Sequence, residues 1–170
     1  MTDRYQQFAT SGPGRVVIRR LGLPDPVRLR RYQPGQPLLT DPALIGAAPG
    51  GRLLDAVAAI LTKADADVRT EPDSSTVDTR YGALVFDATG ITAPEQLRQL
   101  HDFFHPVIRG VAGCGRVLVL GTPPESVTPA AEKIAQRALE GFTRSAGKEL
   151  RRGATVQLVY VAKGAEDAVE

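Results

Sequence analysis

Five short apolar runs alternate with longer amphipathic stretches between residues 43 and 161. The runs are ALIGAA (43–48), ADVRT (66–70), ALVFDAT (83–89), RVLVLG (116–121) and TVQLVYV (155–161). Nearly continuous apolar runs of this length are typical of strands that are buried on both faces of a parallel sheet. With helices between them and right-handed crossovers, the pattern predicts a three-layer, doubly wound α/β fold with a mostly parallel sheet of five strands.

Three of the amphipathic stretches predict helices, at about 52–64, 92–111 and 128–150. Thr92 and Glu95 have the spacing of a capping box at the start of the second helix. Thr128 followed by Pro129 predicts the start of the third helix. The residues expected to form the buried stripe of that helix are Ile134, Ala138, Phe142, Ala146 and Leu150.

The first 42 residues differ in composition from the rest of the chain. The segments SGPG, LPDP, QPGQP and TDP make this part rich in Pro and Gly, which predicts an arm with short helices near 3–10 and 14–22 and an extended segment near 34–40. Residues 1–40 contain seven arginines and two aspartates, a net charge of +5, whereas the other 130 residues carry 14 basic and 17 acidic side chains. The arginines are Arg4, Arg15, Arg19, Arg20, Arg28, Arg30 and Arg31.

This basic arm has three interpretations: contact with its own domain or a sister subunit, contact with an acidic ligand, or contact with nucleic acid. No aromatic-rich platform or zinc-finger spacing accompanies the arginines, so we expect no nucleic-acid partner. No apolar stretch approaches the length of a membrane span, and MTDRYQQFAT lacks the apolar centre of a signal peptide. We therefore expect a cytoplasmic protein without a membrane partner.

Metal and thiol chemistry find little support in the sequence. The single cysteine, Cys114, excludes an intramolecular disulfide and is expected to be a small buried apolar residue. His101 and His105 are four residues apart, a spacing that can ligate metal, but no acidic or cysteine motif accompanies them. We therefore expect no metal site.

The segment IGAAPGGR after the first strand is a candidate phosphate-binding turn. Gly46, Gly50 and Gly51 permit a tight turn, and Arg52 adds positive charge next to the amides of the following helix. However, Pro49 removes one N–H donor, and a structural turn between strand and helix explains the same glycines. Asp87 ends the third strand, where folds of this class place ligand contacts, although it is equally consistent with a hydrogen-bonded turn.

Four segments resemble the short-chain dehydrogenase/reductases. IGAAPGG stands where that superfamily has its T-G-x-x-x-G-x-G loop, ALVFDATGI resembles its LVNNAGI strand, and GRVLVLGT resembles GRIVNISS. ALEGFTRSAGKEL resembles the second half of its catalytic helix, Y-x-x-x-K-x-x-x-x-G-F-T-R-S-L-A-x-E-L. With the leader SGPG…LGLP…LRRY, LHDFFHPV and GCGRV, the chain is similar to the N-terminal half of actinobacterial high-molecular-weight 3-oxoacyl-[acyl-carrier-protein] reductases of fatty-acid metabolism.

The resemblance implies that the catalytic positions are degenerate. The tyrosine position holds Glu132, the lysine position holds Gln136, and Thr122 stands in place of the serine. The asparagines of the superfamily have no counterpart, because the chain contains no asparagine. In the family such a domain precedes a complete ketoreductase domain that uses NADH or NADPH. We therefore expect a non-catalytic domain that itself holds no cofactor.

The resemblance also implies the strand order and the domain boundaries. Only residues 71–82 separate the second and third apolar runs, too few for a further strand and crossover. Removing one strand from the order 3-2-1-4-5-6 leaves 2-1-3-4-5, the flavodoxin-like order. We expect an arm over 1–42 and a degenerate domain over 43–170 that lacks the last helix and strand of the family.

In the superfamily the helices that match 94–110 and 128–152 pack across a two-fold axis. The expected interface residues are Ala135, Ala138, Gly141, Phe142 and Ser145; packing against the sheet of the same domain is the alternative for each of them. The expected partners are a second copy, a catalytic ketoreductase domain, or both, with an acyl-carrier protein as a further candidate. The alternatives are a nucleotide- or acyl-CoA-binding module that uses the Gly46–Arg52 loop, or a reductase that retains activity through Thr122 and Glu132.

Overall fold

The computed structural model describes residues 7–9, 11–21, 27, 29–31, 33–73 and 79–168. The chain separates into two units, Met1–Arg30 and Arg31–Glu170. Arg4 and Arg28, and the side chains of Arg15 and Arg19, lie outside the described residues, so the prediction of a basic arm concerns residues that are largely not described.

In the first unit, residues 7–9 are helical and helix α2 spans Gly12–Arg20. Ser11 begins α2, because its Oγ accepts a hydrogen bond from the N–H of Gly14 at 3.2 Å. A Cβ at Gly14 would overlap the carbonyl of Phe8, so only glycine lets the two helical segments approach this closely. Ala9 and Ile18 are buried within this unit. The predicted helix at 14–22 is thus confirmed, two residues earlier.

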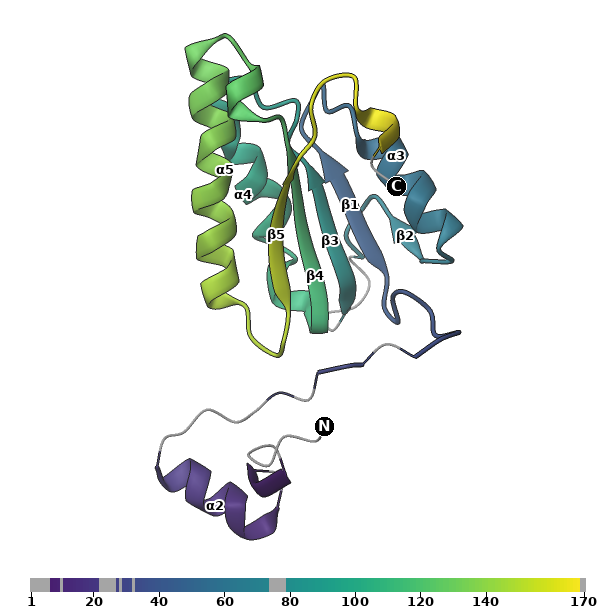
Figure 1. Ribbon diagram of the computed structural model, residues 1–170, viewed down its shortest axis with the longest axis vertical. Coiled ribbons are helices and arrows are strands. Elements are labelled where there is room, and N and C mark those ends of the chain that lie inside the picture. Colours follow the sequence, from purple (N-terminus) through teal and green to yellow (C-terminus); the bar gives the residue numbers. More distant parts are fainter. Residues whose placement is uncertain are drawn as a thin grey trace. The chain divides into compact units, whose positions relative to one another are not determined.

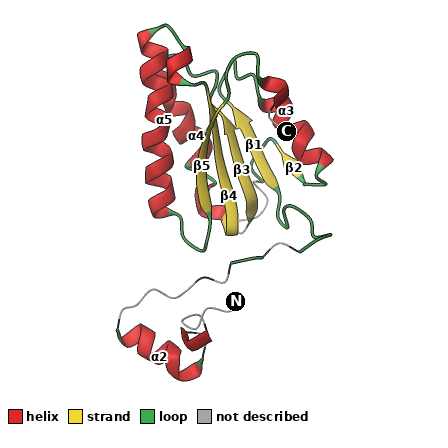
Figure 2. Ribbon diagram, in the orientation of Figure 1, coloured by secondary structure: helices red, strands yellow, loops and turns green. Residues whose placement is uncertain are grey.

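In the second unit, five parallel strands form one sheet in the order β2-β1-β3-β4-β5 (Figures 1 and 2). The strands are β1 (Ala43–Ala47), β2 (Val68–Arg69), β3 (Tyr81–Asp87), β4 (Val111–Gly121) and β5 (Thr155–Tyr160). All four pairings are parallel, as the predicted order requires. The chain has a Rossmann-like α/β fold.

Helices cover both faces of the sheet. Helix α3 (Leu54–Lys63) lies on one face, and α4 (Arg98–Phe104) and α5 (Ala130–Glu149) lie on the other (Figure 1). Short 3₁₀ turns complete the unit: η1 (Pro94–Leu97), η2 (Ile108–Gly110), η3 (Pro124–Ser126) and η4 (Glu166–Ala168). Within the described residues, no helix is long and apolar enough to cross a membrane.

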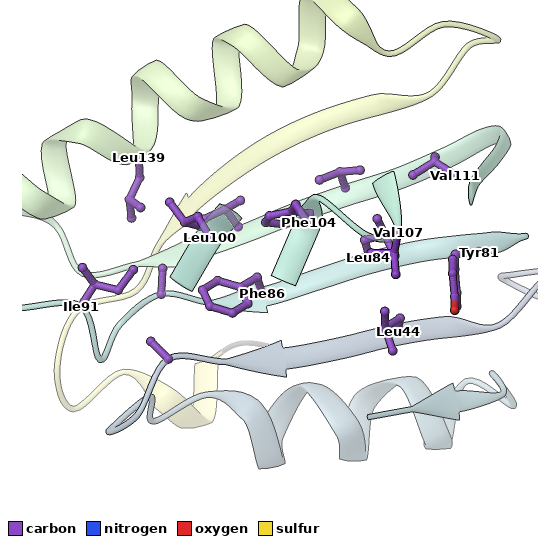
Figure 3. Close-up of a cluster of buried hydrophobic side chains, with 14 of the residues drawn as sticks. Leu44, Tyr81, Leu84, Phe86, Ile91, Leu100, Phe104, Val107, Val111 and Leu139 are labelled. Carbon is purple, nitrogen blue, oxygen red and sulfur yellow. The ribbon is translucent and has the colours of Figure 1, made fainter. Parts of the chain in front are cut away.

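Each face of the sheet has its own apolar core. Under α4 and α5, Leu44, Leu84 and Phe86 of the sheet meet Phe104 and Leu139 of the helices (Figure 3). Under α3, the second cluster consists of Ala43, Ile45, Leu53, Val57, Ala83, Val85, Leu120 and Val161. All seven residues of β3 are buried, as expected for a central strand of a parallel sheet that is covered on both faces. Burial of one such Leu or Phe contributes about 1.5–3 kcal/mol.

The structure corrects two helix predictions. The stretch 92–111 is not one helix but η1, α4 and η2, and Thr92 bonds through its N–H and Oγ1 to Oε1 of Gln96 rather than to Glu95. In α5, Ile134 of the predicted buried stripe is 60% exposed. The buried residues of that helix are instead Glu132, Ala135, Gln136, Leu139 and Ala146. The apolar periodicity of the sequence predicted the wrong buried face, because the polar side chains of Glu132 and Gln136 face the sheet.

Strand β4 starts five residues earlier than predicted and contains a bulge. Tyr81 pairs with Val111, but Ala83 pairs with Arg116, so β4 has three extra residues over this stretch. Cys114 lies in the bulge with φ of 60° and is half-buried rather than buried. The first part of β4 was not predicted because the glycines on either side of Cys114 interrupt the apolar run.

Candidate functional site

The glycine-rich turn joins β1 to α3 at the carboxyl end of the sheet, where folds of this class bind ligands. Gly50 has φ of +81°, a conformation that glycine adopts without strain. Gly90, in the turn after β3, packs directly against this loop, and a Cβ there would lie 2.6 Å from the amide nitrogen of Gly51. The two turns therefore form one closely packed layer.

Three successive amides in the turn just before α3 already have acceptors inside the protein. The N–H of Gly51 donates to Ala48 O at 2.8 Å, and that of Arg52 donates to Thr89 Oγ1 at 3.0 Å. The N–H of Leu53 donates to Asp87 Oδ2 at 2.6 Å. A phosphate at a helix start binds through such free N–H groups. Here no N–H group from Gly51 to Leu53 is left for a ligand.

Asp87 takes the place that an anion would occupy at the start of α3. Its carboxylate is 1% exposed and accepts from Leu53 through one oxygen and from the N–H and hydroxyl of Thr89, at 2.9 and 2.6 Å, through the other. A Cβ at Gly51 would lie 2.7 Å from Oδ2 of Asp87. Asp87 was interpreted above as either a ligand contact or part of a hydrogen-bonded turn, and in the structure its carboxylate forms the hydrogen-bonded turn.

The side chain of Arg52 extends across the carboxyl ends of β4 and β5. Its guanidinium donates to the carbonyl of Val161 and pairs with Glu166, and one nitrogen lies 3.4 Å from Thr122 Oγ1. The pKa of Glu166 is lowered, first by a backbone hydrogen bond to the carboxylate and then by the charge of Arg52. Arg52 therefore joins the segment after β5 to the end of β4. We call this region, formed by the glycine-rich turn and the ends of β3, β4 and β5, the crevice.

Gln136, at the lysine position, is fully buried and hydrogen-bonded on both sides of its amide. Oε1 accepts from the N–H of Thr122 at 2.8 Å, and Nε2 donates to the carbonyls of Ala88 and Ile91 at 2.9 and 2.8 Å. The side chain thus connects α5 to the ends of β3 and β4. Because every polar atom is used within the protein, Gln136 has a structural role in the described conformation.

Glu132, at the tyrosine position, is buried and has few partners. It is 6% exposed, its Oε1 has no hydrogen-bond donor among the described residues, and the nearest charge is Nζ of Lys163 at 3.7 Å. Thr122, at the serine position, has no exposed surface. Proton donation to a substrate oxygen requires contact with that oxygen. The buried Thr122 and Gln136 offer no such contact without rearrangement of the site.

A hollow of about 380 Å³ lies beside the glycine-rich turn. Gly46, Pro49, Thr70, Gln99 and Phe103 contribute to its walls. Phe103 lies against Gly46 so closely that a Cβ there would be 2.6 Å from the ring, and the Phe86 and Phe103 rings have centroids 5.0 Å apart. Oε1 of Gln99 is buried and has no hydrogen-bond partner in the described part of the chain. Aromatic packing thus fills much of the space next to Gly46.

An apolar groove of about 400 Å³ runs between α4 and α5 on the outer surface. It is lined by Leu97, Leu100, His101, Phe104, His105, Ile108, Ala138 and Phe142. The rings of His101 and His105 stack with centroids 4.7 Å apart. Among the described residues, no group of three or more His, Cys, Asp or Glu side chains could hold a metal ion.

The predicted interface residues divide between this outer surface and the core. Ala138 and Phe142 line the groove, and Gly141 and Ser145 are exposed on α5. Ala135 is fully buried against the sheet and is therefore not part of an exposed surface, which corrects that prediction. The physical reason is the rotation of α5, which turns Ala135 and Gln136 inward together.

No protein-family model and no curated protein sequence matches the chain. Among solved structures, one titled "Crystal Structure of a Putative Dehydrogenase from Burkholderia cenocepacia with bound NADP" resembles it over 75% of this chain and 71% of that chain. The sequence identity is 16% and the TM-score is 0.45. At this level of similarity, the likeness carries no inference about the activity of this chain.

Sequence reasoning missed two residues that shape the crevice. Thr89 supplies the acceptor for the N–H of Arg52, and Phe103 covers Gly46. The segment D-A-T-G contains a short-range signal for Thr89, because Asp and Thr side chains commonly hydrogen-bond to backbone groups in turns. No local signal identifies Phe103, since its contact with Gly46 joins residues 57 positions apart in the sequence.

Proposed function

We propose that this chain is a non-catalytic domain of a short-chain dehydrogenase/reductase-type 3-oxoacyl-[acyl-carrier-protein] reductase, and that it acts in assembly and supports a separate catalytic domain. The observation that carries the non-catalytic role is the hydrogen bonding of Gln136, which uses all of its polar atoms within the protein. An amide committed to three backbone groups cannot tune a neighbouring acid as a lysine ammonium would.

The same proposal holds that this chain binds no dinucleotide, whereas its catalytic partner would use NADPH or NADH. The residues of the turn do not fit a pyrophosphate, because the N–H groups of Gly51, Arg52 and Leu53 donate to internal acceptors. In addition, the buried carboxylate of Asp87 would repel a phosphate placed at the start of α3.

Calorimetric titration with NADPH and with NADH tests this part of the proposal. We expect no heat of binding at cofactor concentrations of about 1 mM, which corresponds to a free energy weaker than about −4 kcal/mol. A micromolar dissociation constant would contradict it and favour the nucleotide-binding alternative. In that case Arg52→Ala should weaken binding if the Gly46–Arg52 loop holds the ligand.

The assembly role is supported by the outer surface of α4 and α5. The groove between these helices is lined by apolar and histidine side chains, and Ile134 next to it is 60% exposed. Gly141 is also exposed in the middle of α5, and a Cβ there would meet nothing within 4 Å. Glycine costs about 1 kcal/mol relative to alanine in a helix, so its presence fits a second helix approaching at this point.

Two glycine variants of α5 test the assembly role. Gly141→Arg places a long charged side chain on the proposed interface, whereas Gly147→Arg changes the same helix near Val156, where a Cβ meets only ordinary contact at 3.8 Å. Both changes should preserve the fold, because arginine is a better helix former than glycine. We expect light scattering to show loss of the oligomer only for Gly141→Arg.

Two outcomes would contradict the assembly proposal. Equal molar masses for Gly141→Arg and the unaltered oligomer would exclude the α4–α5 surface as the interface. If the unaltered chain is monomeric at about 100 μM and does not bind an added ketoreductase domain, neither proposed partner uses this surface.

A further inference from the structure

Five exposed arginines lie together at the amino end of the sheet, opposite to the crevice. Arg80 precedes β3, Arg109 precedes β4, Arg116 lies in the first part of β4, and Arg151 and Arg152 precede β5. We call these five residues the arginine patch. Because β3, β4 and β5 are neighbours spaced about 4.8 Å apart, residues at the starts of these strands share one surface.

Backbone contacts connect the members of the arginine patch. One guanidinium nitrogen of Arg80 lies 3.5 Å from the carbonyl of Arg109. Across β4, the guanidinium of Arg116 donates to the carbonyl of Cys114 at 2.9 Å, and the N–H of Cys114 donates to the carbonyl of Arg152 at 2.9 Å. The β4 bulge thus brings Arg116 and the loop before β5 together.

None of the five arginines forms an ion pair with a carboxylate in the described part of the chain. Elsewhere in the same unit, four arginines do have such partners: Arg52 with Glu166, Arg69 with Asp67 and Asp73, Arg98 with Asp102, and Arg137 with Glu125 and Glu140. Arg144 of α5 is exposed and, like the patch, forms no ion pair within the described residues. Glu149, which precedes the patch in α5, pairs with none of its members. The patch is therefore a concentration of positive charge whose members form no ion pair within the described ranges, although Asp73, which pairs with Arg69, lines the same hollow as Arg80 and Arg109.

We propose that the arginine patch is a docking surface for an acidic protein segment. Like charges held this close together repel one another, and an array of carboxylates would relieve that repulsion with charge-assisted hydrogen bonds. The guanidinium group matches the geometry of a carboxylate through paired N–H donors, and it remains charged at every physiological pH. The contact would lie at the opposite end of the sheet from the crevice.

Two features favour an acidic protein over nucleic acid or a membrane. Tyr81, the aromatic residue at the start of β3, is 3% exposed, so it offers no surface on which a base could stack. The exposed large apolar residues of the described chain are Phe8, Val16, Val17, Leu21, Val27, Leu29, Leu38, Ile134 and Val159, and none belongs to the patch. A surface without exposed apolar side chains gains little from insertion into a bilayer.

Fluorescence anisotropy with the full chain and a labelled poly-L-glutamate tests the proposal. The patch variant Arg109→Gln with Arg151→Gln is compared with Arg98→Gln with Arg137→Gln, which removes the same charge from exposed arginines elsewhere. We expect the patch variant to bind about tenfold more weakly and the control pair to change affinity less than about twofold. Raising NaCl from about 50 to about 300 mM should also weaken binding, because salt screens exposed charges.

Three results would overturn the proposal. The absence of binding to poly-L-glutamate at low salt would exclude a docking surface for acidic segments. Equal weakening by the two variant pairs would show that net charge, and not the patch, determines binding. Tighter binding to a labelled oligonucleotide or to phosphatidylserine vesicles than to poly-L-glutamate would identify a different class of partner.

Discussion

Replacing Gln136 by Met tests directly whether this residue is structural. Met has a similar length and volume and retains the apolar contacts of the side chain, but it offers no partner to the N–H of Thr122 or to the carbonyls of Ala88 and Ile91. Gln136 and Thr122 have no exposed surface, and Ala88 is equally buried, so water cannot readily replace the lost hydrogen bonds. The variant therefore leaves three backbone groups without their present partner.

The expected loss of stability follows from those three groups. A buried polar group without a partner costs about 1–3 kcal/mol, and neighbouring groups are not additive, so we expect Gln136→Met to lower the free energy of unfolding by about 3–5 kcal/mol. This is a large part of the 5–15 kcal/mol that is typical of a whole domain. The corresponding fall in Tm is about 10 °C for a chain of this size.

Urea unfolding followed by circular dichroism measures this change through the midpoint and slope of the transition. Gln157→Met is the matched control, because Gln157 lies in β5 with an exposed side chain and should change stability by less than about 0.5 kcal/mol. A loss below about 1 kcal/mol for Gln136→Met would refute the reasoning. It would mean that the loops after β3 and β4 do not depend on the side chain of α5.

Three further predictions concern the crevice. Gly90→Ala should destabilise the chain by at least about 2 kcal/mol in urea unfolding, because its Cβ would meet backbone of the glycine-rich turn at 2.6 Å, and an unchanged midpoint would show that the turn can move. Asp87→Ala should lower stability by about 2–4 kcal/mol, since three donors lose a buried acceptor; a loss no larger than that of a surface substitution would contradict this. Because folding lowers the pKa of Glu166, its carboxylate stabilises the folded chain above about pH 4.5, and this stabilisation is lost as the pH falls through the pKa of the folded state. Proteolysis of the segment after β5 should therefore accelerate on acidification. The Glu166→Gln variant should be cleaved at neutral pH as fast as the unaltered chain is cleaved at acidic pH.

The sheet could be predicted from the sequence, because its signal is local and strong. Each of the five strands overlaps its predicted apolar run, and the short connection before β3 leaves room for five strands only. The start of β4 was not found because Gly113 and Gly115 interrupt the apolar pattern where the strand bulges. Helix α4 was overestimated in length because amphipathic periodicity does not distinguish an α-helix from a succession of 3₁₀ and α-helical turns.

The candidate site was less predictable, because its decisive contacts join distant parts of the chain. Periodicity assigns polar residues to the solvent side of a helix, yet Glu132 and Gln136 both face the sheet. Comparison with the reductase motif located these two positions but could not supply their partners. The carbonyl of Ala88 is 48 residues away from Gln136 in the sequence, and Glu166 is 114 residues away from Arg52.

Taken together, the polar side chains of the crevice satisfy most of one another's hydrogen-bonding groups, which argues that they stabilise the carboxyl end of the sheet. Asp87 at the end of β3 accepts a hydrogen bond from the N–H of Leu53 just before α3, and Arg52 in the same turn pairs with Glu166 after β5. Gln136 joins both halves through neutral hydrogen bonds. Buried polar groups without partners destabilise a fold, so these contacts stabilise the loops around the crevice. Nε of Arg52 and Oε1 of Gln99 and of Glu132 are exceptions, since these buried atoms have no hydrogen-bond partner among the described residues. Of the three side chains, Arg52 pairs with Glu166 and Gln99 is already uncharged, so Glu132 is the position where we expect an uncharged residue of similar size to be tolerated best.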